Sequence, residues 1–201
     1  MVTNGRIKIK NMNTFDLVEW QKLAPNGLIY PWWVHSFLEV LDTWDLKDKT
    51  WLEFGGGRST AWLRSKCKWV DTIEGNLEWA SQAMQDCDRN NLFNGFVYAD
   101  NLPDGVQERK QEFFNLIPND KKYDIISVDG IWRYECLQWA LDHFKGRGGL
   151  LIADNWQQDY VWISPPAEEL MKPYKINKFI QPNHTNHEGR PWNTVYWEIP
   201  K

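Results

Sequence analysis

Cysteine is scarce in this chain, and the familiar cysteine patterns are missing. The 201 residues include three cysteines, Cys67, Cys87 and Cys136, and no two of them have the C-x-x-C spacing of metal or redox sites. An odd number of widely spaced thiols argues against a disulfide framework and predicts reduced cysteines. We therefore expect a cytoplasmic protein.

Long hydrophobic segments are also missing. No apolar run approaches the roughly 18 residues that span a membrane, and the first thirty residues contain no apolar core of the signal-peptide kind. Membrane spanning and secretion are therefore not expected. The formal net charge is only −4, which argues against a general nucleic-acid binder. No repeat or linker divides the sequence, so we predict a single domain over residues 1–201.

Tryptophan, by contrast, is abundant, with 14 residues. The indole ring combines a large apolar body with one hydrogen-bond donor, so packing explains most of these positions. An aromatic-lined pocket is the functional alternative.

The most informative stretch is residues 50–60, T-W-L-E-F-G-G-G-R-S-T. The apolar run that ends at Phe54 predicts a buried strand, and a helix is predicted to begin near Ser59. A strand, a glycine turn and a helix in this order form the nucleotide-binding corner of an open α/β sheet. The residues of the turn are Gly55, Gly56 and Gly57.

Two glutamates indicate the kind of ligand that this corner binds. Glu53 precedes the glycines, and its charge there would repel a pyrophosphate but suit a cationic ligand. Glu74 ends the second apolar run, about 20 residues beyond the turn, from where an acidic residue can reach ribose hydroxyls. The third glycine of the dinucleotide pattern G-x-G-x-x-G is replaced by Thr60. S-adenosylmethionine, with an ammonium, a sulfonium and a ribose but no phosphate, fits this pattern better than a dinucleotide.

The segment E-F-G-G-G-R-S-T at residues 53–60 resembles motif I of the class I S-adenosylmethionine-dependent methyltransferases, and most closely a bacterial and phage-type branch that reads E-F-G-S-G-x-S-T. Further motifs of that branch follow in order: I-E-G-N-L-E-W at 73–79, V-D-G at 128–130 and D-N at 154–155. The resemblance covers roughly residues 50–200. It implies a methyltransferase that uses S-adenosyl-L-methionine. It also implies a Rossmann-like, doubly wound, seven-stranded sheet, mostly parallel, with an antiparallel C-terminal hairpin and helices on both faces.

Acidic residues end five predicted strands, where ligands bind in open α/β sheets. Turn formation is the alternative explanation for one or two of these acids. The five are Glu53, Glu74, Asp100, Asp129 and Asp154. The candidate cofactor-binding residues are Glu53, Gly55, Gly56, Gly57, Ser59, Thr60, Glu74, Gly75, Asp100 and Asp129. The candidate substrate-binding residues are Trp32, Arg133, Asp154 and Asn155.

Methyl transfer from a sulfonium needs little acid–base help, because alignment of an already activated donor supplies much of the rate. A base is needed only if the acceptor must lose a proton. Asp129 and His35 are the catalytic candidates, with His184 and His187 in the tail as further histidines. We expect a small-molecule acceptor, although a sugar, a peptide or a nucleotide stays open, and a homodimer is an open alternative to a monomer.

Asp129, Asp154 and Asn155 also resemble the magnesium ligands of cation-dependent O-methyltransferases, and hard oxygen ligands suit Mg²⁺. The basic residue used as the base in that family is absent from its usual place, which Trp132 occupies with Arg133 beside it. We therefore predict no metal and keep the Mg-dependent enzyme as one alternative. The others are a non-catalytic nucleoside-binding module of the same fold and a nicotinamide-dependent oxidoreductase, which the glycine pattern disfavours.

An N-terminal helical cap or lid, residues 1–45, is predicted beside a Rossmann-like core, residues 50–200. Its expected helices are 15–23 and 31–41, the second opened by Pro31. The expected helices of the core are 76–90, 106–118, 131–144 and 165–174. The expected strands are 51–54, 69–74, 94–100, 123–128, 150–153, 175–180 and 194–199, with a polar loop over 182–191.

Overall fold

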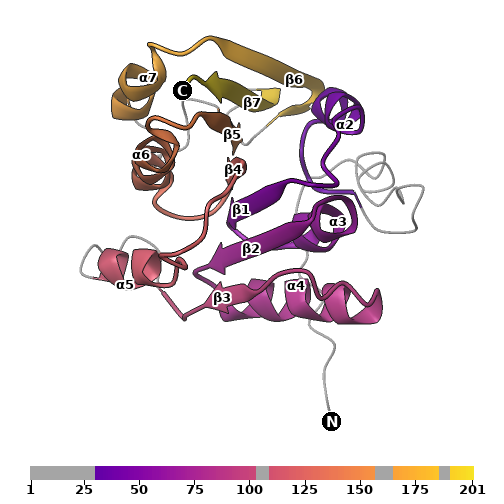
Figure 1. Ribbon diagram of the computed structural model, residues 1–201. Coiled ribbons are helices and arrows are strands. Elements are labelled where there is room, and N and C mark those ends of the chain that lie inside the picture. The colour runs from indigo at the N-terminus through magenta and orange to yellow at the C-terminus, as the bar shows by residue number, and fades with distance from the viewer. Residues whose placement is uncertain (1–29, 103–108, 157–164, 186–190) are drawn as a thin grey trace.

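The computed structural model describes residues 30–102, 109–156, 165–185 and 191–201. One seven-stranded sheet runs through it in the order β3-β2-β1-β4-β5-β7-β6 (Figure 1). The first five strands along the chain are parallel, and β7 is antiparallel to both β5 and β6. The predicted fold class is therefore confirmed.

The strands are β1 (Thr50–Phe54), β2 (Trp69–Glu74), β3 (Val97–Ala99), β4 (Ile125–Val128), β5 (Gly149–Asp154), β6 (Ile176–Thr185) and β7 (Pro191–Ile199). The helices are α2 (His35–Leu41), α3 (Arg58–Lys66), α4 (Leu77–Arg89), α5 (Lys110–Asn115), α6 (Arg133–Phe144) and α7 (Pro165–Met171). Within these described segments, no helix has the length and apolar character needed to cross a membrane.

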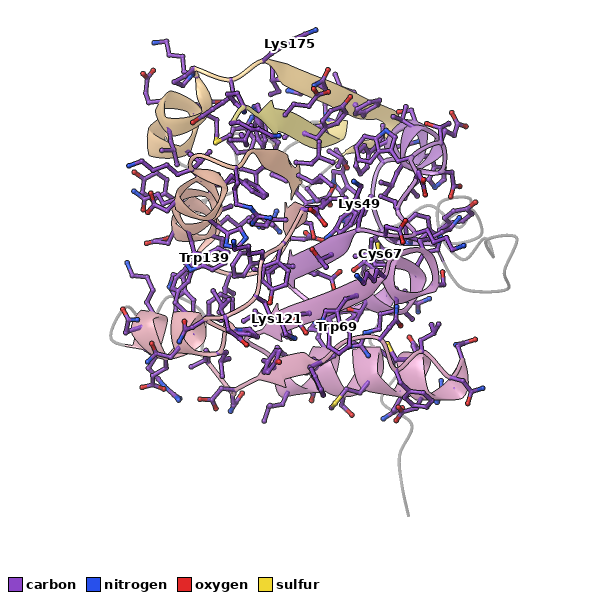
Figure 2. All side chains as sticks on the ribbon, in the orientation of Figure 1. Lys49, Cys67, Trp69, Lys121, Trp139 and Lys175 are labelled. Atoms are coloured by element: carbon purple, nitrogen blue, oxygen red, sulfur yellow. The ribbon has the colours of Figure 1, made fainter. Side chains whose placement is uncertain are left out.

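The sheet has an apolar layer on each face, which is why its central strands read as continuous hydrophobic runs. On β1, Trp51 packs in the cluster with α2 and α3, while Leu52 and Phe54 pack in the cluster with α5, α6 and α7. Figure 2 shows side chains filling both layers, with Cys67 on the α3 side and Trp139 on the α6 side. Alternation along the strand thus assigns each β1 side chain to one of two cores.

The backbone turns after β1 and β4 are in contact. Gly55 has a φ of +97°, and a Cβ built on it would lie 2.5 Å from the nitrogen of Gly130. Only glycine tolerates both this dihedral and this approach. The ends of two neighbouring strands therefore come together, and a cavity opens beside them.

A buried carboxylate ties the outer part of the sheet together away from that cavity. Asp71, which is fully buried on β2, accepts hydrogen bonds from Tyr123 Oη at 2.8 Å and from Lys121 Nζ at 2.7 Å. The Lys121 ammonium also lies 4.5 Å from the centre of the Trp69 ring, and Figure 2 shows the two side chains together. Because a buried charge is costly unless it is paired, we assign this group a structural role.

Some predicted boundaries were wrong. The helix expected from Pro31 begins at His35, because Val34 N–H and His35 N–H donate to Thr194 Oγ1 and Gln181 Oε1 instead of opening a helix earlier. The polar loop expected over 182–191 is partly strand, since β6 extends to Thr185 and β7 begins at Pro191. The helix expected over 15–23 lies outside the described residues. Of the helix expected over 106–118, residues 109–118 are described, and there α5 ends at Asn115, three residues earlier than expected.

Candidate functional site

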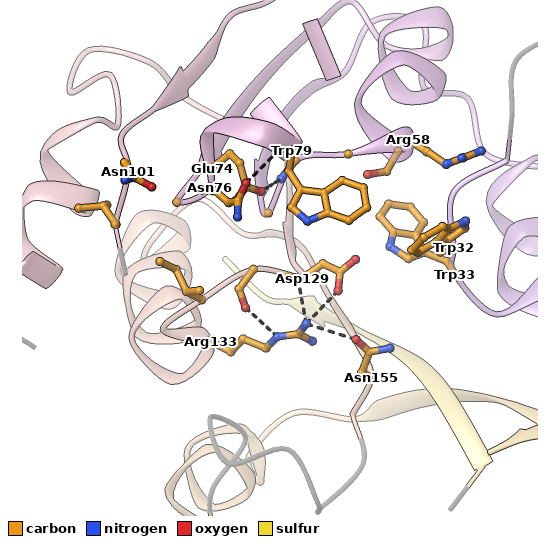
Figure 3. A pocket seen from close by; sticks show the side chains of 18 residues that line it. Trp32, Trp33, Arg58, Glu74, Asn76, Trp79, Asn101, Asp129, Arg133 and Asn155 are labelled. Atoms are coloured by element: carbon orange, nitrogen blue, oxygen red, sulfur yellow. Dashed lines mark hydrogen bonds and ion pairs between the residues drawn. The ribbon is translucent and has the colours of Figure 1, made fainter. Parts of the chain in front are cut away.

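A cavity of about 540 Å³ opens at the carboxyl ends of the parallel strands (Figure 3). This is the edge of an open α/β sheet at which ligands bind. The predicted site residues that line it are Trp32, Gly55, Gly56, Gly57, Ser59, Glu74, Gly75, Asp129, Arg133 and Asn155. The predicted site residues that do not line it are His35, Glu53, Thr60, Asp100 and Asp154.

The backbone amides of the glycine turn donate hydrogen bonds to acceptors within the protein. Gly55 N–H donates to the Ile73 carbonyl at 2.9 Å, and Gly57 N–H donates to Thr60 Oγ1 at 3.2 Å. Gly56 N–H donates to Glu74 Oε2 at 2.6 Å. A phosphate cradle needs such amides pointing at the ligand. Because all three glycine amides already have protein acceptors, this turn is not arranged to hold a pyrophosphate.

Glu74 joins the turn to the start of α4. Its second oxygen, Oε1, accepts the Asn76 N–H at 2.8 Å, and the side chain of Asn76 caps α4 by accepting the Glu78 N–H at 2.8 Å. Burial raises the pKa of Glu74 to about 7, while the backbone donors oppose that rise. Each carboxylate oxygen still has a second lone pair, so Glu74 can accept hydroxyl hydrogen bonds from a ligand in the cavity.

Glu53 does not face the cavity, contrary to the prediction. It is 1% exposed and accepts hydrogen bonds from the hydroxyls of Ser59, Thr60 at 2.6 Å and Thr72 at 2.9 Å. The reason is the two-residue period of a strand: Glu53 shares the face of Trp51, which α3 covers. Burial raises the pKa of Glu53 to about 7 against these three donors. Glu53 therefore fixes the first turn of α3 to the end of β1, through its hydrogen bonds with Ser59 and Thr60.

Arg133 is the centre of the polar network at the ends of β4 and β5. It is 4% exposed, and its Nη2 lies 2.9 Å from Asp129 Oδ1 and 3.2 Å from Asn155 Oδ1. The same guanidinium donates to the carbonyls of Asp129 at 2.8 Å, Gly130 at 3.0 Å and Asp154. Arg133 lines the cavity as predicted, but these bonds commit its guanidinium chiefly to the protein and not to an acceptor.

Asp129 remains partly accessible beside this cation, with a side chain 29% exposed. Burial raises its pKa, while the charge of Arg133 and hydrogen bonds from the Trp33 indole and from Arg133 lower it. Of the two catalytic candidates, Asp129 is the one that lines the cavity.

Asp154 points away from the cavity, where its carboxyl accepts the Thr194 hydroxyl. Burial and the nearby Asp129 raise the pKa of Asp154 well above its usual range. The three ligands of the magnesium alternative therefore do not converge: the cation bonded to Asp129 and Asn155 is the Arg133 guanidinium. Over the described ranges, no group of three or more His, Cys, Asp or Glu residues could hold a metal ion.

Two other candidates lie beside the cavity. His35 lines a narrow neighbouring cleft with Asp154 and Gln181, apart from the glycine turn. Asp100 pairs with Arg109 at 3.1 Å and accepts the Asn101 N–H at 2.7 Å, so it has the turn-forming role that was its alternative. The side chains of His184 and His187 lie outside the described part of the chain.

Other lining residues were not assigned to the site from the sequence. They come from loops and helix starts, and packing decides whether such residues reach the cavity. The E-W pair at Glu78 and Trp79 did indicate the helix that carries Trp79. They are Trp33, Asn76, Trp79, Asn101, Leu102, Gly130 and Ile131. Figure 3 shows Trp32, Trp33 and Arg58 at one end of the cavity and Asn101 at the other.

No protein-family model matches the sequence, and no curated protein sequence matches it. Solved structures do match. The chain is similar to a tRNA methyltransferase of Aquifex aeolicus, with 18% identity and a TM-score of 0.58 over 90% of this chain and 71% of that one. It is also similar to an S-adenosylmethionine-dependent O-methyltransferase of Thermotoga maritima, with 13% identity and a TM-score of 0.56 over 92% and 69%. A precorrin 8W decarboxylase of Methanobacterium thermoautotrophicum matches with 17% identity and a TM-score of 0.59 over 90% and 98%.

At these identities the likeness establishes the fold, which is the Rossmann-like fold of the methyltransferases. The proteins that share it carry different names: one is a tRNA methyltransferase and another an O-methyltransferase. The fold therefore does not select an acceptor.

Proposed function

We propose that the chain is an S-adenosylmethionine-dependent methyltransferase that acts on a small-molecule acceptor. The observation that carries the proposal is the glycine turn, whose three amides bind protein acceptors beside the carboxyl groups of Glu74 and Asp129. Such a site disfavours a pyrophosphate and suits a cationic ligand with ribose hydroxyls. The motif E-F-G-x-G-x-S-T supports the bacterial and phage-type branch.

The residues present fit this cofactor. Glu74 would accept the ribose hydroxyls, and Leu102 and Ile131 offer apolar surface for the base. The cofactor, when bound, supplies a methyl group already activated by the positive sulfur. The task left to the protein is to align the acceptor and to exclude water.

Asp129 is the proposed base for an acceptor that must lose a proton. It is the carboxyl group at the end of β4, and Arg133 and the Trp33 indole fix its orientation. Its raised pKa brings it closer to the operating pH, which favours proton transfer.

A metal is not part of the proposal. In this chain a buried guanidinium supplies the positive charge between the ends of β4 and β5. The Mg-dependent alternative would require Arg133 to leave and the carboxyl of Asp154 to turn away from Thr194.

Calorimetry tests the proposal without knowledge of the acceptor. We expect S-adenosylmethionine and S-adenosylhomocysteine to bind with micromolar dissociation constants, about −8 kcal/mol. NADH should bind far more weakly, because its pyrophosphate finds the glycine amides already bonded. Absence of heat and of a thermal shift with both sulfur ligands at millimolar concentration would overturn the proposal. Tight NADH binding would favour the oxidoreductase alternative.

A further inference from the structure

Two large aromatic side chains that line the cavity remain exposed, one at the end with Arg58 and the other between that end and Glu74. Trp32 is 44% exposed and Trp79 is 43% exposed. Their rings lie edge to face, with centroids 6.0 Å apart, although they come from segments far apart in the sequence. Tryptophan is usually well buried, so two half-exposed indoles meeting at a cavity form surface that a ligand can cover.

Arg58 adds a positive charge to this pair. Its Cζ lies 5.6 Å from the centre of the Trp32 ring, and Figure 3 shows both side chains at the same end of the cavity. Among the residues that the structure describes, no carboxylate pairs with Arg58, in contrast to the fully engaged Arg133. A guanidinium that stacks on an indole keeps its edge donors for an anion.

The opposite end has different chemistry. Figure 3 shows Asn101 at that end, with Glu74 and Asn76 between it and Trp79, and the proposed function places the ribose and the base on this side. The part of the cavity from Trp79 to Trp32 and Arg58 is therefore left for the acceptor.

We infer that the acceptor is a flat aromatic molecule that carries a negative charge. Its ring packs on Trp32 and Trp79, and its carboxylate or phosphate pairs with Arg58. The inference rests on the proposed function, because it assigns the other end of the cavity to the cofactor. Arg58, Trp32 and Trp79 thus determine specificity and take no part in the chemical step.

Calorimetry on protein saturated with S-adenosylhomocysteine separates the ring from the charge. The four probes are 4-hydroxybenzoate, with both features; 4-hydroxybenzyl alcohol, with the ring alone; cyclohexanecarboxylate, with the charge alone; and tyramine, with the ring and a positive charge. 6-Hydroxy-2-naphthoate serves as a larger anionic ring. We expect at least one of the two aromatic acids to bind at least tenfold tighter than each of the other three probes. Equal affinities, or no binding of either aromatic acid and of the nucleotide probe described below, would overturn the inference.

Variants then assign the contacts. Arg58→Gln should weaken binding of the aromatic acids at least tenfold, leave the neutral ring unaffected and leave the affinity for S-adenosylhomocysteine unchanged. Trp32→Leu should weaken binding of both the charged and the neutral ring. Arg89→Gln, which removes an exposed guanidinium on α4, is the matched control and should change nothing. If Arg58→Gln weakens S-adenosylhomocysteine binding instead, Arg58 holds the cofactor and the inference is wrong.

Different results overturn the proposed function and the assignment of the acceptor. If wild-type protein does not bind S-adenosylhomocysteine, the proposed function falls, and the inference falls with it. Normal cofactor binding without a preference for the aromatic acids, or for the nucleotide over its nucleoside, overturns the inference alone.

A nucleotide has the same chemistry, a flat base with a phosphate, so cytidine 5′-monophosphate and cytidine form a second pair of probes. Tighter binding of the nucleotide than of the aromatic acids would place the acceptor among nucleotides, and the reverse order would place it among small aromatic acids. A phosphate that adds nothing to cytidine binding would count against the role of Arg58.

Discussion

Arg133 Nη2 lies 2.9 Å from Asp129 Oδ1, and the buried guanidinium of this ion pair joins the ends of β4 and β5. One side chain thereby fixes the orientation of Asp129 and replaces the cation that the aspartates could otherwise bind. Because Arg133 and Asp129 neutralise each other, removing either side chain leaves the other charge without its counterion.

Removing this guanidinium should destabilise the fold. Arg133→Met keeps much of the side-chain volume but removes the cation beside Asp129. Because Asp129 is 29% exposed, the loss should approach but not exceed the cost of breaking a buried ion pair, about 3–5 kcal/mol. Urea denaturation measures the free energy of unfolding. Arg89→Met is the control, because its side chain is 67% exposed and its ion pair with Asp86, at 3.5 Å, is worth at most about 1 kcal/mol. Similar losses in the two variants would contradict the role given to Arg133.

Methyl transfer should persist in excess EDTA once an acceptor is known. The reason is that the Arg133 guanidinium, rather than a metal ion, is bonded to Asp129 and Asn155. Activity is measured with and without chelator and with added Mg²⁺. Loss of activity in EDTA that Mg²⁺ restores would promote Asp129, Asp154 and Asn155 to metal ligands.

Glu74→Ala should weaken binding of S-adenosylhomocysteine by roughly 2–4 kcal/mol, on the order of 30- to 1000-fold, because hydrogen bonds to a charged acceptor are lost. Glu74→Gln should lose less, since its amide oxygen still accepts. The alanine variant also releases the amides of Gly56 and Asn76. Circular dichroism must therefore confirm folding before calorimetry is interpreted. Equal affinities in folded wild type and variants would remove the ribose contact.

Gly55→Ala should destabilise the protein by roughly 2–5 kcal/mol, through strain at positive φ and through overlap with the backbone of Gly130. Gly146→Ala is the matched comparison. It has a φ of +72° with no atom within 4 Å of the added Cβ, so only backbone strain of about 1–2 kcal/mol applies. Urea denaturation compares the two, and equal losses would show that the contact between the turns is not needed.

Glu53 should make stability depend on pH. Its pKa is about 7 in the folded chain against an ordinary value of 4.5, so the folded chain holds more protons between these values. The free energy of unfolding should therefore fall as the pH rises from about 4.5 to 7, by up to on the order of 3 kcal/mol, and then level off. Comparing wild type with Glu53→Gln isolates this group, and the exposed Glu39→Gln is the control. Parallel pH profiles for wild type and Glu53→Gln would show that Glu53 ionises normally.

The sequence alone determined the fold class, the glycine turn and the placing of Glu74 beside it. These features depend on local order along the chain. Buried parallel strands appear as short apolar runs, and the residues at their ends must meet at one edge of the sheet. Strand and helix boundaries were less well determined at Pro31 and in the tail, where hydrogen bonds to distant strands set them.

Only the tertiary structure decided what the charged and aromatic residues of the site contact. Glu53 was expected to face the ligand, but α3 covers its face of β1. Arg133 was expected to hold an acceptor, but it bonds to the end of β5. Trp32 and Trp79 meet although no spacing in the sequence relates them. The physical reason is the same in each case: a side chain takes the partner that packing brings within reach, and for these residues that partner belongs to another segment of the chain.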